Sequence, residues 1–326
     1  MSTLPRALNE ALHGLAPHLP LAVAFSGGAD STALLLACWQ RWPQQVAAIH
    51  VNHGLQEAAA GFEAFARQFC TARGIPLHIE YPHARHASGE SPEDAARKAR
   101  YAALARGVQA LNQAQTLPQP IASIALAQHA DDQVETLLLA LSRGAGLPGL
   151  AAMPRQWERN GLLWLRPWLT VPGPQLRHWL QQQGQNWVED PSNLDLHYTR
   201  NRIRHRIVPV LEQAFPAFRQ TLARSSAHAQ QAQQILEEVA QADLAVVGVP
   251  PSIRALQALS APRQANVLRH WLKQHHGIAA QHRQMQELQR QIMACTTRGH
   301  QIHLKIANGH VQRHNAWLHW LTSSPA

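Results

Sequence analysis

Cysteine is scarce in this chain, and long apolar runs are absent. The 326 residues include three cysteines, Cys38, Cys70 and Cys295, with no C-x-x-C pair. This spacing argues against a disulfide framework or a zinc or iron–sulfur site, and it fits a reducing cytoplasm. No apolar run reaches the roughly 18 residues that span a membrane, and the charged, proline-containing start does not resemble a secretion signal. We therefore expect a cytoplasmic protein that has no membrane partner.

Lysine is also rare, because only three of the 29 basic residues are lysines. The charge is uneven: 18 Lys and Arg against 16 Asp and Glu give +2 up to residue 217, whereas 11 against 4 give +7 from residue 218 onward. Arginine forks suit bidentate phosphate contacts, so the basic last third favours a polyanionic partner over a merely solubilising surface. The length predicts two domains, residues 1–217 and 218–326.

Apolar runs alternate with helical patterns through the first two hundred residues. This alternation predicts an α/β fold with a doubly wound parallel sheet, whose ligand lies at the carboxyl ends of the strands. Beyond it, we expect a linker helix and a smaller, mainly helical α+β C-terminal domain with a hairpin at Asn308-Gly309. The predicted strands are 21–25, 46–51, 77–81 and 121–127, and the predicted helices are 4–15, 32–42, 57–73, 92–106, 129–141 and 212–243.

The string SGGADS at residues 26–31 joins the first predicted strand to a helix. Glycines let the backbone approach a phosphate, and the helix N-terminus favours an anion at the same place. Asp30 is repulsive there unless it binds a metal ion or only caps the helix. The plain alternative is a strand-to-helix turn without a ligand.

Polar clusters follow two other predicted strands. His50, Asn52 and His53 come after the second strand, and the sequence HADDQVET, which contains Asp131, Asp132 and Glu135, comes after the fourth. On a helical wheel these acids lie opposite the apolar arc of that helix. They predict a site for Mg²⁺ or a cationic substrate, although acids in a first turn also complement a helix dipole.

Arg97 and Arg100 share one face of the preceding predicted helix. Two arginines that face the crevice can neutralise phosphate charge in an adenylyl transfer. Salt bridging within the helix is the simpler alternative.

Several strings together resemble one family. They are SGGADS, HVNHGL, EDAARKARY, HADDQVETLLLALSRGAG, RPWL and DPSNLDLHYTRNRIRHRIVPVL, in this order over most of residues 21–211. They resemble the tRNA(Ile)-lysidine synthetase family, of the N-type PP-loop ATP pyrophosphatases. The resemblance implies a ligase that uses ATP to adenylate the wobble cytidine of a CAU-anticodon isoleucine tRNA and then joins free L-lysine to it. Longer members carry a further C-terminal subdomain, so the resemblance implies a short form.

The resemblance also assigns roles to residues. ATP and Mg²⁺ are the expected co-substrate and metal, and tRNA and L-lysine are the expected partners. A homodimer stays open, and the alternatives are a PP-loop tRNA thiolase or an RNA-binding protein with a relic nucleotide site. The implied residues are Asp30, Arg97, Arg100 and Asp132 for catalysis, Ser26, Gly27, Gly28, Ala29, Asp30, Ser31 and His53 for ATP, Asp131, Asp132 and Glu135 for lysine or metal, and Arg200, Arg202, Arg204 and Arg206 for tRNA.

Overall fold

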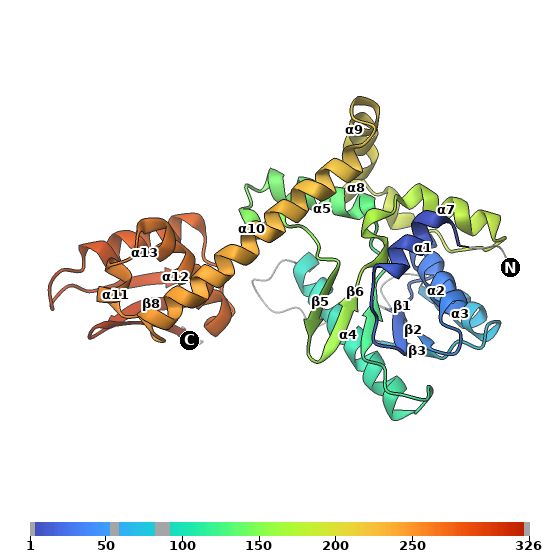
Figure 1. The fold of residues 1–326 in the computed structure, drawn as a ribbon, viewed down its shortest axis with the longest axis horizontal. Helices are drawn as coiled ribbons and strands as arrows, with labels where there is room; N and C mark the ends of the chain where they lie inside the picture. Colours follow the sequence, from blue (N-terminus) through green and yellow to red (C-terminus); the bar gives the residue numbers. More distant parts are fainter. Residues whose placement is uncertain (1–3, 53–58, 82–91, 323–326) are drawn as a thin grey trace. The chain divides into compact units, whose positions relative to one another are not determined.

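The computed structural model of the protein describes residues 4–52, 59–81 and 92–322 (Figure 1). The chain forms two compact units, Met1–Ala227 and His228–Ala326. This division lies inside the long helix α10 (Phe218–Val247), whereas the predicted domain boundary lies at the start of that helix. The boundary after residue 217 stays a prediction.

A six-stranded sheet organises the first unit, with the strand order β3-β2-β1-β4-β6-β5. All neighbours pair in parallel except β5 and β6, which form an antiparallel hairpin. The predicted α/β class is confirmed, but this hairpin was not predicted. The order of strands reverses between β1 and β4, which makes a topological switch point. The strands are β1 (Leu21–Ala24), β2 (Val46–Val51), β3 (Leu77–Glu80), β4 (Ser123–Ala125), β5 (Gln156–Arg159) and β6 (Leu162–Leu165).

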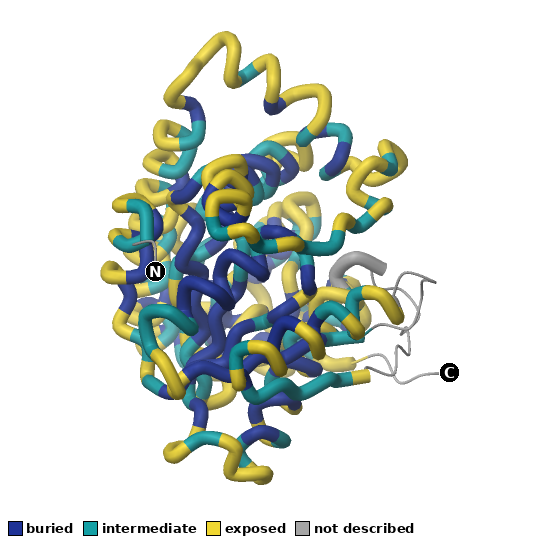
Figure 2. Tube along the Cα trace, turned by 90° about the vertical axis from the view of Figure 1, so that its right-hand side faces the viewer, coloured by how far each residue is buried: buried dark blue, intermediate teal, exposed yellow. Residues whose placement is uncertain are grey.

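Alternate residues of the central strands enter two cores, one on each face of the sheet. Leu21 and Val23 pack with helices α1, α2, α3 and α7, whereas Ala22 packs with α4. Because both faces are covered, the central strands β1, β2 and β4 are mainly apolar and almost wholly buried. Buried residues are dark blue in Figure 2. The helices are α1 (Arg6–His13), α2 (Ala29–Arg41), α3 (Ala59–Thr71), α4 (Pro92–Gln113), α5 (Ala130–Ser142), α6 (Leu147–Leu150), α7 (Gly173–Gln182), α8 (Thr199–Arg202) and α9 (Val208–Ala214), with 3₁₀ turns η1 (Pro167–Thr170) and η2 (Pro191–Leu194).

The second unit packs helices against a three-stranded antiparallel sheet. Its core includes Leu268, Leu288 and Val311, which are fully buried. The helices, besides the end of α10, are α11 (Ile253–Gln257), α12 (Ala261–His276) and α13 (His282–Ala294), and the strands, in sheet order, are β7 (His303–Ile306), β8 (Gly309–His314) and β9 (Trp317–Thr322).

The predicted hairpin near Asn308 is confirmed, but its turn lies one residue earlier than predicted. Ile306 pairs with Gly309, so Ala307 and Asn308 form the turn and Ala307 has a φ of 52°. Gly309 is the first residue of β8, and a Cβ there would lie 2.5 Å from Cζ2 of Trp320. The glycine is therefore needed for packing, not for the turn itself.

Among the described residues, no helix is long and apolar enough to cross a membrane. The three cysteines are buried and unpaired, as their spacing predicts. Burial raises the pKa of Cys70 to about 12. Burial also raises the pKa of Cys38, so neither of these two cysteines is a ready thiolate at neutral pH.

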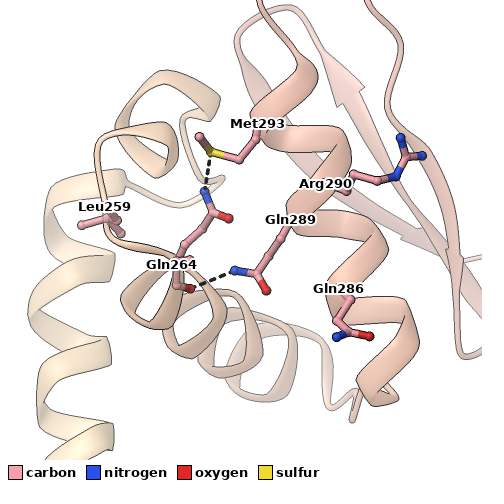
Figure 3. Close-up of a pocket in the computed structure, with 7 residues that line it drawn as sticks. Leu259, Gln264, Gln286, Gln289, Arg290 and Met293 are labelled. Carbon is pink, nitrogen blue, oxygen red and sulfur yellow. Dashed lines mark hydrogen bonds between the residues drawn. The ribbon is translucent and has the colours of Figure 1, made fainter.

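A surface pocket of about 300 Å³ lies between α12 and α13 in the second unit (Figure 3). Gln264 and Gln289 reach into it, and their amides are already bonded to Met293 Sδ (3.6 Å) and the Ala261 carbonyl (2.8 Å). Arg290, on its rim, pairs with Glu287 at 2.6 Å. The polar groups of this pocket are thus largely satisfied within the unit itself.

Candidate active site

The turn between β1 and α2 has the geometry of an anion cradle. Gly27 has a φ of 89°, and a Cβ there would lie 3.3 Å from Cδ1 of Phe65. Ser31 Oγ donates to the Gly28 carbonyl (3.0 Å) and lies 3.0 Å from Ser26 Oγ. Gly28 caps α2 without a side-chain hydrogen bond. The first turn of a 13-residue helix therefore presents its backbone N–H groups beside two hydroxyls, a suitable site for a phosphate.

Asp30 faces the end of β4 from the first turn of α2. Its Oδ2 lies 3.5 Å from Nε2 of His129, the N-cap residue of α5. Its Oδ1 is buried and has no hydrogen-bond partner among the residues that the structure describes. Burial acts to raise the pKa of this carboxyl, but His129, together with the charges of Arg177 and Arg204, outweighs burial, and the net pKa is lowered. Asp30 is thus an ionised group with one unsatisfied oxygen, as expected for a cation ligand.

His129 joins the two helix starts. Its ring is buried and lies within 3.6 Å of carboxylate oxygens of Asp30, Asp131 and Asp132. Burial opposes a charge on the ring, but Asp132 and Asp30 raise the pKa of His129 to about 9. In the neutral ring, Nδ1 instead accepts from the Asp131 amide at 3.2 Å. The carboxylates and the helix cap therefore favour opposite protonation states of Nδ1.

Asp131 is engaged by the protein on both oxygens. Oδ2 accepts from the backbone N of Gly173 (2.8 Å), and Oδ1 accepts from Nε of Arg219 (2.6 Å). The side chain is nearly buried. These contacts fix α7 and α10 against α5, and they argue against the predicted lysine or metal contact of Asp131.

Glu135 is fully buried and makes a bidentate pair with Arg204. Arg204 Nε and Nη2 donate to its two oxygens at 2.7 and 3.1 Å, and Nη2 also reaches Asp132 Oδ1 at 3.3 Å. Arg200 Nε lies 3.7 Å from Glu135 Oε2. The two partners respond in opposite ways: burial raises the pKa of Glu135 despite the pair, whereas Glu135 raises the pKa of Arg204 despite burial. Burial dominates for the carboxylate because it has no solvent contact.

The segment that contains the predicted tRNA-binding arginines is not one regular helix. After α8 the chain forms a π-helical segment, η3 (Ile203–Ile207), before α9. Arg200 and Arg204 turn toward the acids, whereas Arg202 donates to the carbonyls of Leu196 and His197. Arg206 is exposed. π-Helical turns often mark functional sites. Here the π-helical segment lies next to Arg200 and contains Arg204, and both arginines contact the carboxylate of Glu135.

The predicted catalytic arginines lie on α4 without a carboxylate partner. Arg97 and Arg100 are exposed and pair with no acid in the described part of the chain. Crowding by the surrounding protein, and then the charges of Arg200 and Arg97, lower the pKa of Arg100. These two guanidiniums therefore form a positively charged patch that can bind an anion. His53, also predicted to bind ATP, lies outside the described residues.

Arg166 is a buried cation that the sequence motif RPWL contained but that was given no role. It is 1% exposed and donates to Gln128 Oε1 (3.1 Å), the Pro154 carbonyl (2.8 Å) and Tyr101 Oη (2.8 Å). Its guanidinium stacks 4.1 Å from the centroid of Trp157. Through Tyr101 it fixes the helix that carries Arg97 and Arg100.

Three further charged residues were missed. His129 was recognised only as part of a polar arc, Arg219 had no local motif, and Arg177 of α7 lies close enough to help lower the pKa of Asp30. In the described residues no group of three or more His, Cys, Asp or Glu could hold a metal ion by itself.

Two family models match parts of this chain. Residues 2–211 match the model described as the PP-loop domain, and residues 252–319 match the TilS substrate binding domain. A solved structure, the U34-tRNA thiolase NcsA from Methanococcus maripaludis with its [4Fe-4S] cluster, has a TM-score of 0.56 at 16% identity and covers 68% of this chain and 77% of its own. At this identity the likeness concerns the fold alone.

Curated relatives named tRNA(Ile)-lysidine synthase are much more similar. The protein from Polaromonas naphthalenivorans is 57% identical over 94% of this chain and 94% of its own length. Those from Ralstonia nicotianae and Pseudomonas aeruginosa are 38% and 42% identical over 91% and 77% of this chain. The matches span 64% and 58% of the lengths of these two relatives.

Proposed function

Because the chain belongs to the tRNA(Ile)-lysidine synthase family, we propose that it joins L-lysine to the wobble cytidine of an isoleucine tRNA with a CAU anticodon. In the first step ATP adenylates the C2 oxygen of that cytidine, and pyrophosphate leaves. In the second step the ε-amine of lysine attacks C2, and AMP leaves. The observation that supports this most directly is the contact between Asp30 and His129, which joins the anion cradle to the acidic start of α5.

The cradle would hold the pyrophosphate part of ATP. The backbone of residues 26–31 supplies N–H donors at the N-terminus of α2, and Ser26 and Ser31 add hydroxyls. Asp30 Oδ1, which has no hydrogen-bond partner among the described residues, fits a Mg²⁺ ligand. When bound, Mg²⁺ neutralises phosphate charge and polarises the reacting phosphate.

Arg97 and Arg100 would stabilise charge that develops on the phosphate during adenylation. They are unpaired with acids in the described chain and belong to a helix fixed by Tyr101 and Arg166. A cation that is already oriented before the reaction costs no reorganisation when charge develops. The loss of either arginine should therefore affect the rate of adenylation more than the binding of tRNA.

Asp132 and Glu135 would receive the lysine ammonium. Asp132 keeps 15% of its side chain exposed, and its contact with Arg204 is long at 3.3 Å. Glu135 is already paired with Arg204, so Asp132 has more capacity for a second cation. The attacking amine must lose a proton, and Asp132 is the carboxylate we assign to accept it.

The proposal is tested with purified full-length protein, ATP, radiolabelled lysine and a CAU-anticodon tRNA. We expect label to enter the tRNA, and Asp30→Asn to lower the rate by about 100-fold, the size of losing one preorganised electrostatic contact. Glu10→Gln is the matched control, because it also removes one carboxylate charge, at an exposed position where the side chain pairs with Arg6 on the same helix.

Two results would contradict these assignments separately. Absence of label in the tRNA, with folded wild-type protein, would overturn the proposed reaction. A full rate for Asp30→Asn would remove Asp30 from the catalytic group while leaving the reaction intact. Pyrophosphate exchange into ATP that depends on tRNA reports the first step alone, and a pure RNA-binding protein would show none.

A further inference from the structure

The outer face of the sheet in the second unit carries an unusual set of side chains. Alternate residues of its strands, such as Ile306, Val311 and Leu318, point inward and are fully buried. The intervening residues point away from that core. We call six of these outward residues the histidine face: His303, Lys305, His310, His314, Trp317 and His319.

The strand register places these side chains next to one another. Lys305 pairs with His310, and His314 pairs with Trp317 across the sheet. The rings of His303 and His310 stack at 4.7 Å with an interplanar angle of 6°, and those of His314 and His319 meet edge to face at 5.8 Å. Trp317 remains 42% exposed. The face therefore presents several flat rings on a rigid sheet.

Negative charge is missing from this part of the chain. After Glu287 the sequence contains no Asp or Glu through to residue 326. By contrast, the pocket on the helical side has an arginine, Arg290, that is already paired with Glu287. In the described part of this unit, the sheet face is thus the surface where an accessible cation, Lys305, lies among exposed rings and away from any carboxylate on its own strands.

We propose that the histidine face is the surface on which this unit docks an unpaired stretch of the tRNA substrate. Bases stack on exposed aromatic and imidazole rings, and a cation beside them contacts the phosphate backbone. Leu321, which pairs with His310 and is 51% exposed, lies on the same face as Trp317, but a surface for a protein partner would need a larger apolar centre than these two side chains. This inference rests on the proposed function, because tRNA is the polyanion that the function supplies.

The chain offers a matched pair of charge reversals. The second unit contains two lysines, Lys305 on the face and Lys273 on α12, and both are exposed. Lys305→Glu and Lys273→Glu change the net charge equally. We expect Lys305→Glu to weaken tRNA binding by about 10-fold and to lower the salt slope by about one, as for a lost phosphate contact. Lys273→Glu should change the Kd by less than about 3-fold.

Trp317→Ala tests stacking in the same assay. We expect a Kd raised about 10-fold, within the range measured for the loss of one stacked base. Met293→Ala is the control, because Met293 is an exposed side chain (54%) on the helical side of the same unit. Thermal melting of each variant shows whether the unit still folds, and His303→Ala, which removes an exposed ring without a core contact, gives a second variant if Trp317→Ala unfolds.

Direct binding and lysine transfer are measured separately, so the two proposals fail differently. Equal weakening by Lys305→Glu and Lys273→Glu would overturn the histidine face, because binding would then follow net charge alone. Unchanged binding in the folded Trp317→Ala and His303→Ala variants would overturn it as well. A wild-type protein that binds tRNA through this face but transfers no lysine would overturn only the proposed reaction.

Discussion

Replacing Arg204 by methionine should destabilise the first unit far more than replacing its partner Glu135 by glutamine. Glu135 has no exposed side-chain surface, whereas Arg204 is 29% exposed and also contacts Asp132. Removing one partner of a buried pair costs about 3–5 kcal/mol when the remaining charge cannot reach water. Arg204→Met leaves such a charge, so we expect a loss of about 3 kcal/mol.

Glu135→Gln removes the buried charge instead and leaves the partly exposed Arg204 without this partner. The pKa of Glu135 is raised by burial even with the pair intact, so its ionised form is held at a net cost that a neutral amide avoids. Arg204 keeps Asp132 and some solvent. We expect this change to cost within about 1 kcal/mol, in line with neutral isosteres of buried pairs.

Melting temperatures measure the difference. For a unit of this size about 1 kcal/mol shifts Tm by roughly 2–4 °C, so Arg204→Met should lower Tm by about 6–12 °C. Arg6→Met is the matched control, because Arg6 forms an exposed pair with Glu10 and is 92% exposed. Its Tm should fall by at most about 2 °C, since such pairs contribute little.

The deficit of Arg204→Met should also depend on pH. A carboxyl whose folded pKa is raised contributes stability below its unfolded pKa and loses it as pH rises through the folded pKa. Removing Arg204 raises the folded pKa of Glu135 further, so the deficit should be largest at pH 8 and should shrink on acidification toward pH 4. A Glu135→Gln variant that melts lower than Arg204→Met, or a deficit that grows in acid, would refute this reasoning.

Three further changes test other parts of the site. Gly27→Ala should weaken ATP binding at least about 10-fold, because its φ of 89° and the Phe65 ring 3.3 Å from the new Cβ strain the turn. Gly61→Ala is the control, because a Cβ at Gly61 meets open space. Equal effects of the two changes in a nucleotide-binding titration would contradict this prediction. Asp131→Asn should lower Tm by about 4–9 °C through its lost pair with Arg219 and leave the KM for lysine unchanged; a selective rise in that KM would restore Asp131 as a ligand. Arg166→Lys should slow adenylation and lower Tm, because lysine cannot reproduce the three separated hydrogen bonds of Arg166. Tyr101→Phe should reproduce part of the kinetic loss. An unchanged adenylation rate in both variants would contradict the role of Arg166 in positioning α4.

The fold could be predicted where the signal is local. Each central strand is an apolar run, and the turn at Gly27 follows from glycines within a few residues of a helix start. The hairpin β5–β6 was not predicted because the edge strand Gln156–Arg159 is polar and largely exposed. Its Asn160-Gly161 turn, with φ values of 53° and 72°, is a typical hairpin signal that the surrounding pattern did not emphasise.

The site could be predicted only in part, because its charge balance depends on distant residues. The acids of α5 are visible in a short motif, but their partners lie 69 residues away at Arg204 and 88 residues away at Arg219. No periodicity indicates which arginine will meet which acid. The pattern therefore predicts an acidic helix start. Only the structure distinguishes Asp131, whose two carboxylate oxygens are both hydrogen-bonded within the protein, from the more accessible Asp132.

The arginine segment after η2, which is predicted to bind tRNA, is joined to the acids of α5 more closely than its sequence pattern implies. In a regular helix Arg200 and Arg204 share a face, and the π-helical segment keeps both directed at Glu135 while Arg206 remains exposed. Arg202 is bonded to backbone carbonyls of the preceding loop, and Asn201 fastens the same loop through Ser192 and Asp195. A ligand that moves this segment from its exposed side must therefore also move the cations that neutralise Glu135. Since a buried carboxylate without its cation favours protonation, such a movement would change the charge that faces Asp132 and Asp30.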